Sequence, residues 1–241
     1  MLLSIIIPCR DEADTILETV NYISEELNSI NHELILINDF SDDNTLNILE
    51  DVSKSKSRIH AYNNNIKGLG GAIETGIKKS NGKYTTIMMA DLSDNVSDLK
   101  NYIEIATKDK SLDAVFGSRF QKESRVYNYP LKKLLLNRLF NYFVKIIFFS
   151  NYNDFTNAFK LYKKDALLEL FPIVSENFNI FLELPLKIIS RGFKYKITSI
   201  SWNNRKKGKS KFNVKELSSK YFFTLAYCFM EKHLLRKKKL K

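Results

Sequence analysis

The sequence is poor in the residues on which disulfide-rich and zinc-dependent proteins rely. Its 241 residues include two cysteines, three histidines, one tryptophan, four prolines and eight glycines. Cys9 and Cys228 cannot form a disulfide framework, and with the scattered histidines they match no zinc-site spacing. These scarcities exclude a disulfide-stabilised secreted domain and a zinc enzyme, and they favour a reducing compartment.

Long hydrophobic runs are also missing. The longest uncharged apolar run, residues 221–230, has 10 residues, whereas a membrane-spanning helix needs ~20. The N-terminal residues lack the basic region and cleavage site of a signal peptide, and their pattern is that of a buried strand. We therefore expect a cytoplasmic protein that is soluble or associates peripherally with the cytoplasmic face of a membrane.

Enough apolar material is present for an extensive core. Hydrophobic residues make up 44% of the chain and aromatic residues 12%, which excludes a disordered or low-complexity chain. The length suits one sizeable domain with a short appendage. We place the boundary so that residues 1–212 form the main domain and residues 213–241 a basic C-terminal helix and tail.

The net charge of +11 is concentrated at the C-terminal end. Residues 205–241 contain 13 basic and 2 acidic residues, whereas residues 1–100 contain 9 basic and 16 acidic residues. A basic end on a neutral body predicts a polyanionic partner, such as an anionic lipid or a phosphorylated ligand. We expect no nucleic-acid partner, because no recognised binding module accompanies the basic residues, and nucleic-acid binding through the tail stays a weaker alternative. The alternative is a solvated tail.

Strand and helix patterns alternate through the first half of the chain. Expected strands cover residues 2–8, 33–38, 58–62, 84–89 and 112–117, and expected helices cover 11–29, 70–80 and 96–107, with another beginning near residue 45. This alternation predicts an α/β fold with a mainly parallel central sheet and helices on both faces. In the second half we expect helices at 131–149 and 179–190, strands at 157–162 and 194–202, and a helix ending near residue 233.

Polar loops follow the expected strands, where parallel sheets bind ligands. Two glycine motifs in these loops fail on inspection. A dinucleotide fingerprint beginning at Gly68 would need glycine at Ile73, and a P-loop beginning at Gly71 would need lysine at Ile77. A dehydrogenase and a P-loop kinase are therefore excluded.

Seven short strings in one order resemble a family 2 glycosyltransferase with the GT-A fold, in particular its dolichol-phosphate mannosyltransferase-like branch. The first three are Pro8-Cys9-Arg10-Asp11-Glu12, Asn38-Asp39-Phe40-Ser41-Asp42-Asp43-Asn44-Thr45 and the glycine-containing stretch 65–72. The others are Met89-Ala90-Asp91-Leu92-Ser93, Gly117-Ser118-Arg119-Phe120, 154–160 and 205–211. Each string is weak alone, and their common order makes the resemblance specific.

The resemblance implies transfer of a sugar from a GDP- or UDP-sugar to a polyprenyl phosphate, with inversion at the anomeric carbon. It assigns donor binding to Pro8, Arg10, Glu12, Asp39, Gly68, Gly70 and Asp91. It assigns catalysis to Asp91, Arg119 and Arg205, and the acceptor phosphate to Lys133, Ser210 and Lys211. It also implies Mg²⁺ or Mn²⁺ held by Asp91 and Ser93.

The chemistry of the residues agrees with this assignment. Asp39 can accept hydrogen bonds from a base, Glu12 can hold ribose or base, and the glycines let the backbone approach a ligand closely. A phosphate monoester has a second pKa of ~6 and is already anionic at neutral pH, so the transfer requires no general base.

The sequence departs from the family strings at three positions. Met89 replaces the first carboxylate of the D-x-D string, Asn38 replaces the first aspartate of the earlier pair, and Arg10 replaces a tyrosine. Asp91 is thus left as the main metal carboxylate. Two alternatives stay open: a hydroxyl acceptor with Asp94 or Asp154 as general base, and a non-catalytic relative that binds a nucleotide sugar.

The expected helix at 131–149 has two stripes. A polar stripe contains Lys133, Asn137, Asn141 and Lys145, and an apolar stripe contains Leu131, Leu135, Leu139, Phe143 and Ile147. A basic amphipathic helix of this kind lies in the headgroup plane of an anionic membrane with its apolar side toward the acyl chains. Basic residues 236–239 would add a second anchor. The alternative is that the helix packs its apolar side on the sheet.

Overall fold

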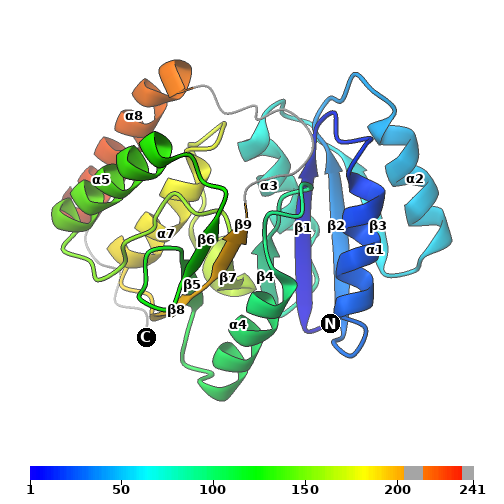
Figure 1. Ribbon diagram of the computed structural model, residues 1–241, viewed down its shortest axis with the longest axis horizontal. Helices are drawn as coiled ribbons and strands as arrows, with labels where there is room; N and C mark the ends of the chain where they lie inside the picture. The colour runs from blue at the N-terminus through cyan, green and yellow to red at the C-terminus, as the bar shows by residue number, and fades with distance from the viewer. Residues whose placement is uncertain (204–213, 235–241) are drawn as a thin grey trace.

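The computed structural model describes residues 1–203 and 214–234, and a seven-stranded sheet forms its centre (Figure 1). The strands are β1 (Leu3–Cys9), β2 (His32–Asn38), β3 (Ile59–Asn63), β4 (Tyr84–Ile87), β5 (Ala114–Ser118), β7 (Lys160–Lys163) and β8 (Tyr195–Ser199). Their order is β3-β2-β1-β4-β7-β5-β8, and β7 alone runs antiparallel to its neighbours in this sheet. The expected mainly parallel sheet is confirmed.

Helices cover both faces of the sheet, as expected. They are α1 (Ile16–Glu26), α2 (Thr45–Ser55), α3 (Leu69–Lys79), α4 (Val96–Lys108), α5 (Leu131–Ile147), α6 (Lys164–Glu169), α7 (Ile180–Ser190) and α8 (Val214–Leu234). One core joins α1, α2 and α4 to the sheet, and a second core joins α3 and α5–α8 to the other face. In β1, Ile5 belongs to the first core and Ile6 to the second, which explains why this strand is apolar at both alternating positions.

The single strand expected at residues 194–202 is two strands. The main-sheet strand β8 ends at Ser199, and β9 (Ser201–Asn203) pairs with the short strand β6 (Arg125–Tyr127) in a separate two-stranded sheet. Ile200 lies between them and is buried, and its amide donates to the Ser118 carbonyl. The alternating sequence continues through this crossing, so the pattern alone did not reveal the change of sheet.

Two other elements differ from the sequence expectation. The strand expected to begin at residue 157 begins at Lys160, because the Asn157 side chain accepts from the Phe159 amide and holds a turn there. Helix α6 was not expected from the sequence. It has six residues, too few to establish a helical repeat.

Lys160 is a buried cation in this structure. Its Nζ donates to the carbonyl oxygens of Phe155, at 3.1 Å, and Asn157. Burial lowers the pKa of Lys160 from 10.5 to about 7, with Asp154 opposing and Arg119 assisting that shift. The folded protein therefore binds this proton more weakly than the unfolded chain does.

This difference predicts a pH-dependent stability. Between pH 7 and 10.5 the unfolded chain holds the Lys160 proton that the folded protein releases, so the free energy of unfolding rises with pH, by up to ~1.4 kcal/mol per unit. The same contribution is lost as the pH falls toward 7. The free energy of unfolding, measured with urea at several pH values from 7 to 10, should rise less steeply with pH for Lys160→Met than for the unchanged chain. Equal slopes would contradict the assignment.

Helix α5 packs on the protein through its asparagines. Asn141 is buried, and its Nδ2 donates to Asn137 Oδ1 at 2.6 Å and to Thr156 Oγ1 at 3.1 Å. Thr156 Oγ1 in turn donates to Asn137 Oδ1 at 2.8 Å. The middle of the polar stripe thus faces inward, where its amides hold α5 to the loop before β7.

The leucines of α5 face outward. Leu131 is 81% exposed and Leu139 64% exposed, and Leu135 and Phe143 are exposed with them. The alternative in which this stripe packs on the sheet is therefore wrong for these four residues. Among the residues described, no helix combines the length and hydropathy of a membrane span.

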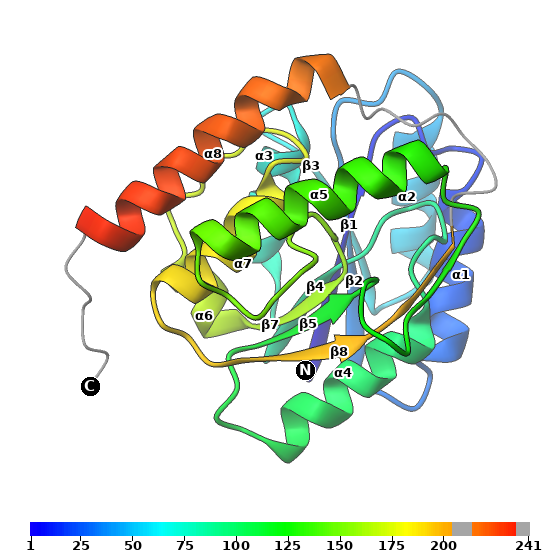
Figure 2. The same ribbon diagram turned by 60° about the vertical axis from the view of Figure 1, so that its left-hand side comes forward.

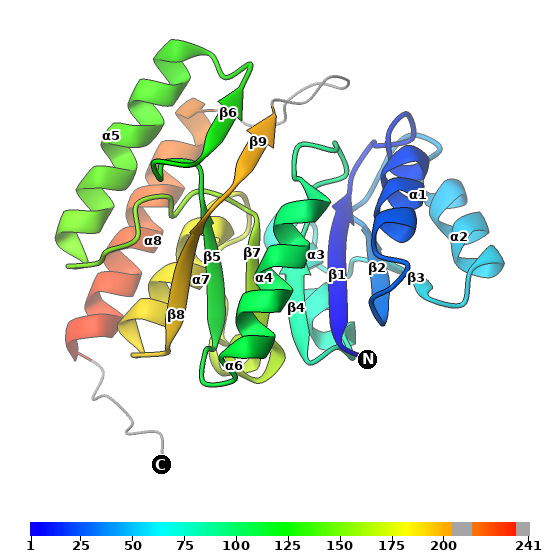
Figure 3. The same cartoon turned by 60° about the horizontal axis from the view of Figure 1, so that its bottom comes forward.

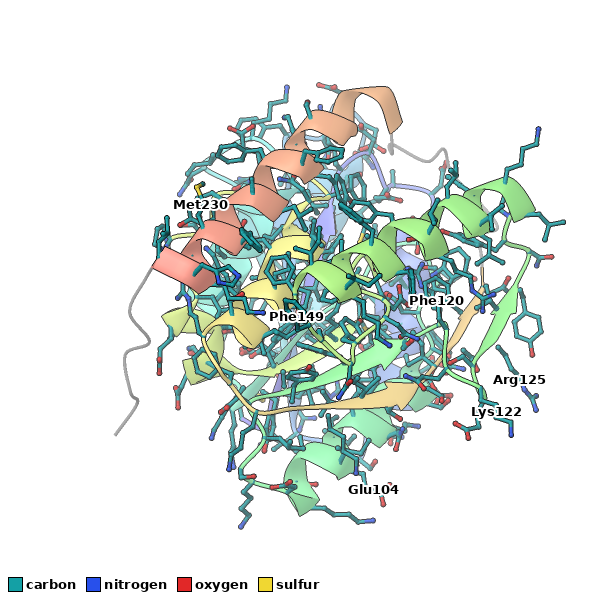
Figure 4. The ribbon with its side chains drawn as sticks, turned by 90° about the vertical axis from the view of Figure 1, so that its left-hand side faces the viewer. Glu104, Phe120, Lys122, Arg125, Phe149 and Met230 are labelled. Carbon is teal, nitrogen blue, oxygen red and sulfur yellow. The ribbon has the colours of Figure 1, made fainter. Side chains whose placement is uncertain are left out.

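Helix α8 lies alongside α5 on the same side of the molecule (Figure 2). Its inner face joins the second core through Leu225 and Cys228. Its outer face exposes Phe222, Phe223, Phe229, Met230 and Leu234. Phe149, just after α5, is exposed on the same side as Met230 (Figure 4). We call the exposed apolar residues of 131–149 and 222–234 the α5–α8 face.

Candidate functional site

The loops after β1 and β2 meet at one edge of the sheet. Cys9 pairs with Asn38 in register, and the Asp39 amide donates to the Cys9 carbonyl at 2.7 Å. Beyond the strands, the Glu12 amide donates to Thr45 Oγ1 at 2.8 Å. The parallel strands thus bring together two sequence strings that lie some thirty residues apart.

Asp39 is buried beneath this edge and fixes the loop that follows β3. Its Oδ1 accepts hydrogen bonds from the Gly68 amide and from Asn64 Nδ2, both at 2.8 Å. Asn64 Nδ2 also donates to the Gly68 carbonyl at 3.2 Å. The carboxylate expected to recognise a base therefore also organises the glycine loop, and Asn64 is a partner that the sequence analysis missed.

Gly68 and Gly70 face another segment of the protein. The Gly70 amide donates to the Glu176 carbonyl at 2.8 Å, and a Cβ on Gly70 would lie 1.8 Å from the Ser175 carbonyl oxygen. Gly68 has a φ of +122°, and a Cβ there would lie 2.7 Å from the Glu176 carbonyl oxygen. The amides of both glycines thus donate to Asp39 and Glu176, and contact of Gly68 and Gly70 with a nucleotide stays a prediction.

The segment that covers the glycines is held by a buried ion pair. Glu183 accepts from the amides of Val174, at 3.0 Å, and Ser175, at 2.8 Å. Lys187 lies 2.5 Å from Glu183, and both side chains are buried. Two charges one turn apart in an otherwise apolar helix were the sequence signal for this pair.

The close approach predicts a large effect of Gly70→Ala. The added methyl group would collide with backbone at Ser175, which cannot move without breaking its bond to Glu183. We expect a loss of at least ~2 kcal/mol in the free energy of unfolding, the scale of overpacking in a core. Urea unfolding measures it, with Lys78→Ala, at an exposed site on the same helix, as the control. A loss below 0.5 kcal/mol would contradict the packing described.

Asp91 and Asp94 lie in the loop after β4. Asp91 is half-buried, and its Oδ1 accepts from the Ser93 amide at 3.1 Å. Asp94 is buried, and its Oδ2 accepts from the Met89 amide at 3.4 Å. Burial, and next the charge of Asp91, raise the pKa of Asp94 to about 7. Met89 is half-buried and packs against the second core.

This loop offers oxygen atoms for a divalent cation whose other ligands a substrate would supply. No group of three His, Cys, Asp or Glu side chains placed to hold a metal occurs in residues 1–203 and 214–234. Magnesium needs one or two protein carboxylates when substrate phosphates supply its other ligands. The carboxylate of Asp91 with the neighbouring Ser93 hydroxyl fits that requirement, since both donors are oxygen atoms.

Arg119 forms a buried two-point ion pair with Asp154. Its Nη2 donates to Asp154 Oδ1 at 2.7 Å and its Nε to Oδ2 at 2.9 Å, while its amide donates to Oδ2 at 2.8 Å. Burial alone would lower the pKa of Arg119, but Asp154 raises it above its ordinary value. Both oxygens of Asp154 are engaged and the residue is fully buried, so Asp154 as a general base is wrong.

Three aromatic rings surround the Arg119 guanidinium. Its Cζ lies 5.5 Å from the ring centre of Phe120, 5.9 Å from that of Tyr129 and 5.7 Å from that of Trp202. Tyr129 also accepts a hydrogen bond from Asn137 of α5 at 2.9 Å. Arg119 is therefore a fixed charge at the point where β5, β9 and α5 meet.

Residues 4–171 match the family described as Glycosyl transferase family 2, which is most of the chain. The chain belongs to this family. The glycosyltransferase AglD of Haloferax volcanii is 27% identical over 205 residues, covering 83% of this chain and 32% of that protein. The dolichol-phosphate mannosyltransferase of Pyrococcus furiosus is 30% identical over 138 residues, 57% of this chain and 39% of that protein. This chain thus spans about a third of these relatives' length.

Solved structures with the same fold include glucosyl-3-phosphoglycerate synthase from Mycobacterium tuberculosis. Its complex with UDP has a TM-score of 0.70 at 14% identity, covering 95% of this chain and 80% of that one. Its complex with Mn²⁺, UDP and phosphoglyceric acid has a TM-score of 0.71 at 14% identity, covering 95% and 78%. At 14% identity this likeness establishes the GT-A fold alone.

The remaining residues implicated by the family 2 strings lie as follows. Pro8 is buried within β1, and Arg10 and Glu12 are half-buried at the edge beyond it. Lys133 is exposed in the first turn of α5. Arg205, Ser210 and Lys211 lie outside the described residues.

Proposed function

We propose that the chain is the catalytic domain of an enzyme that transfers a sugar from a GDP- or UDP-sugar to a polyprenyl phosphate, with inversion. The observation that carries the proposal is the α5–α8 face, an exposed apolar surface joined to Arg119 through Asn137 and Tyr129. A lipid acceptor must be met at such a surface. The relative named dolichol-phosphate mannosyltransferase supports the same class of acceptor.

Donor binding is proposed at the edge formed after β1, β2 and β4. Asp39, fixed by Gly68 and Asn64, recognises the base, and Glu12 and Arg10 lie beside it at the same edge. Asp91 and Ser93 would hold Mg²⁺ or Mn²⁺ on the diphosphate, where the cation neutralises charge on the leaving group. Asp91 is therefore the residue on which departure of the nucleotide depends.

The acceptor side needs positive charge and no base. A phosphate monoester is an anion at neutral pH and attacks the anomeric carbon directly, which agrees with the engagement of Asp154 by Arg119. Arg119 supplies a fixed positive charge, and Lys133, Arg205, Ser210 and Lys211 are the proposed contacts to the acceptor phosphate. Only Arg119 and Lys133 of these lie in the described part of the chain.

Transfer assays test this function directly. A panel of GDP- and UDP-sugars is incubated with polyprenyl phosphate, with saccharides that offer only hydroxyl groups, and with no acceptor, each with Mg²⁺, with Mn²⁺ and with chelator. We expect transfer to the lipid phosphate alone. Transfer only to hydroxyl acceptors would show that the acceptor is a saccharide and not a polyprenyl phosphate. Donor binding without any turnover would identify a non-catalytic relative.

Peripheral attachment to the cytoplasmic face of a membrane is part of the proposal. Lys132, Lys133, Arg138 and Lys145 of α5 flank the outward leucines and suit an anionic lipid surface. The second expected anchor, residues 236–239, lies outside the described residues. An outward apolar stripe beside basic side chains is the pattern of a helix in the headgroup plane.

Vesicle flotation tests the attachment. The unchanged chain should float with anionic vesicles and dissociate as salt rises, and Leu135→Ser with Leu139→Ser should weaken binding at least ~10-fold, because each leucine buries apolar area worth over ~1 kcal/mol. Leu168→Ser, at an exposed leucine of α6, is the matched control. An unchanged chain that remains soluble at low salt with excess acidic lipid would overturn the attachment.

A further inference from the structure

One turn of α8 contacts the segment that covers the glycines. Thr224 of α8 is fully buried, and its Oγ1 accepts a hydrogen bond from Asn179 Nδ2 at 2.9 Å. Asn179 Nδ2 also donates to Ser175 Oγ at 2.9 Å, and the Ser175 and Thr224 hydroxyls share a third hydrogen bond at 3.3 Å. We call these three residues the hydroxyl–amide triad. Figure 3 shows α8 alongside α7, on the opposite side of the molecule from α1 and α2.

The hydroxyl–amide triad lies against the loop of residues 68–70, here called the glycine loop. A Cβ on Gly70 would lie 1.8 Å from the Ser175 carbonyl oxygen, and the Gly70 amide donates to the Glu176 carbonyl at 2.8 Å. At the start of the same loop, the Gly68 amide donates to Asp39 Oδ1 at 2.8 Å. A continuous path of hydrogen bonds and backbone contacts therefore runs from α8 to Asp39.

Each member of the hydroxyl–amide triad depends on the other two for its hydrogen bonds. All three side chains are buried, and buried polar groups in folded proteins have hydrogen-bond partners. Removing the Thr224 hydroxyl would take an acceptor from the Asn179 amide group. The segment at Ser175 would then have to shift or admit water to satisfy this donor. Because its backbone touches Gly70, such a shift would loosen the glycine loop.

The same turn of α8 belongs to the α5–α8 face. Phe222 and Phe223 immediately precede Thr224 and are exposed, so the helix that carries the apolar face also contacts the segment behind the glycine loop. Resting on the donor site proposed at Asp39, we infer that α8 positions the glycine loop for the nucleotide through the hydroxyl–amide triad. Thr224 is then a positioning residue of the donor site, since it acts through the loop and touches no substrate.

Two variants break the hydroxyl–amide triad from opposite sides. Thr224→Val nearly keeps the side-chain shape and removes its hydroxyl. Ser175→Ala removes the other hydroxyl and leaves the backbone hydrogen bond from this residue to Glu183. Thr224→Ser keeps the hydroxyl and tests rescue, and Ser219→Ala, at an exposed site of the same helix, is the matched control.

Two measurements are made on each variant. Amide hydrogen exchange over residues 64–72 reports local opening of the glycine loop without any ligand, and residues 84–87 of β4 report the stability of the sheet. Calorimetric titration with UDP and with GDP reports the donor site. We expect exchange of the glycine loop at least about threefold faster in Thr224→Val and Ser175→Ala, with β4 unchanged. The nucleotide should bind about three- to tenfold more weakly, the scale of one or two hydrogen bonds.

Thr224→Ser and Ser219→Ala should match the unchanged chain in both measurements. Unchanged exchange of the glycine loop in both triad variants would overturn the inference, and so would an equal acceleration in β4, which marks a general loss of stability. Faster loop exchange with unchanged nucleotide affinity would overturn the link to the donor site. If neither nucleotide binds the unchanged chain, the proposed donor site fails, while the exchange data still decide whether α8 holds the loop. No acceptor is present, so failure of the proposed acceptor would leave these results unaffected.

Discussion

Asp91→Asn is expected to lower kcat at least ~100-fold while thermal unfolding stays unchanged. Asp91 is the only carboxylate of the D-x-D string that this sequence retains, since Met89 occupies the first position. The substitution preserves the size and the hydrogen bond from the Ser93 amide but removes the charge that would hold a cation on the diphosphate. Loss of one electrostatic group acting on the transition state commonly costs 10²–10³-fold.

The measurement is initial-rate transfer at several Mg²⁺ concentrations, with Asp51→Asn, at an exposed site on α2, as the control. If Asp91 binds the cation, added Mg²⁺ should restore part of the lost rate. Activity of Asp91→Asn within twofold of the unchanged chain would remove Asp91 from the site. Equal loss in both variants would indicate a general effect of charge.

Asp154→Ala is expected to destabilise the fold by about 3–5 kcal/mol, the cost of leaving one buried charge without its partner. Arg119 is nine-tenths buried. The Asp154 carboxylate accepts hydrogen bonds from the Nε, the Nη2 and the backbone amide of Arg119. Truncating the carboxylate leaves these donors without an acceptor among the rings of Phe120 and Trp202. Urea unfolding at neutral pH gives the loss directly.

A second variant separates a buried-charge effect from lost packing. Arg119→Met with Asp154→Leu replaces both charges by apolar side chains of similar size, and such replacements are often neutral or stabilising. We therefore expect the double variant to regain most of the stability that Asp154→Ala loses, while transfer activity stays low because the fixed positive charge is gone. A double variant as unstable as Asp154→Ala would show that the pair stabilises the fold through its packing and hydrogen-bond geometry, and that the unpaired charge is not the cause of the loss.

The sequence was sufficient for the sheet because burial on both faces leaves a local pattern. Runs with the pattern of buried strands predicted β1 and β2 to within one residue at each end, and polar residues after each strand predicted the edge that holds Asp39 and Asp91. Strand–helix alternation then predicted a mainly parallel sheet, since such units connect in one hand. Each of these inferences uses neighbours in the chain.

Contacts between segments far apart in the chain could not be predicted from the sequence. Gly68 and Gly70 have the composition of a ligand loop, yet the backbone at 175–176 lies against them. Asn137 and Asn141 fall on a polar stripe that normally faces water, yet they bond to Thr156 and leave the leucines of α5 outside. Buried polar groups are hydrogen-bonded in folded proteins, as Asn141 is here, so polarity alone did not decide which side of α5 faces inward.

The sequence by itself determined the fold class, the family and the edge of the sheet at which Asp39 and Asp91 lie, because these follow from periodicity and from short strings in order. Only the tertiary structure decided that Arg119 is paired with Asp154, that α5 and α8 share one apolar face, and that Thr224 of α8 bonds to the segment behind the glycine loop. These features depend on residues far apart in the chain. Their partners are set by packing in three dimensions, which leaves no repeat or spacing in the sequence.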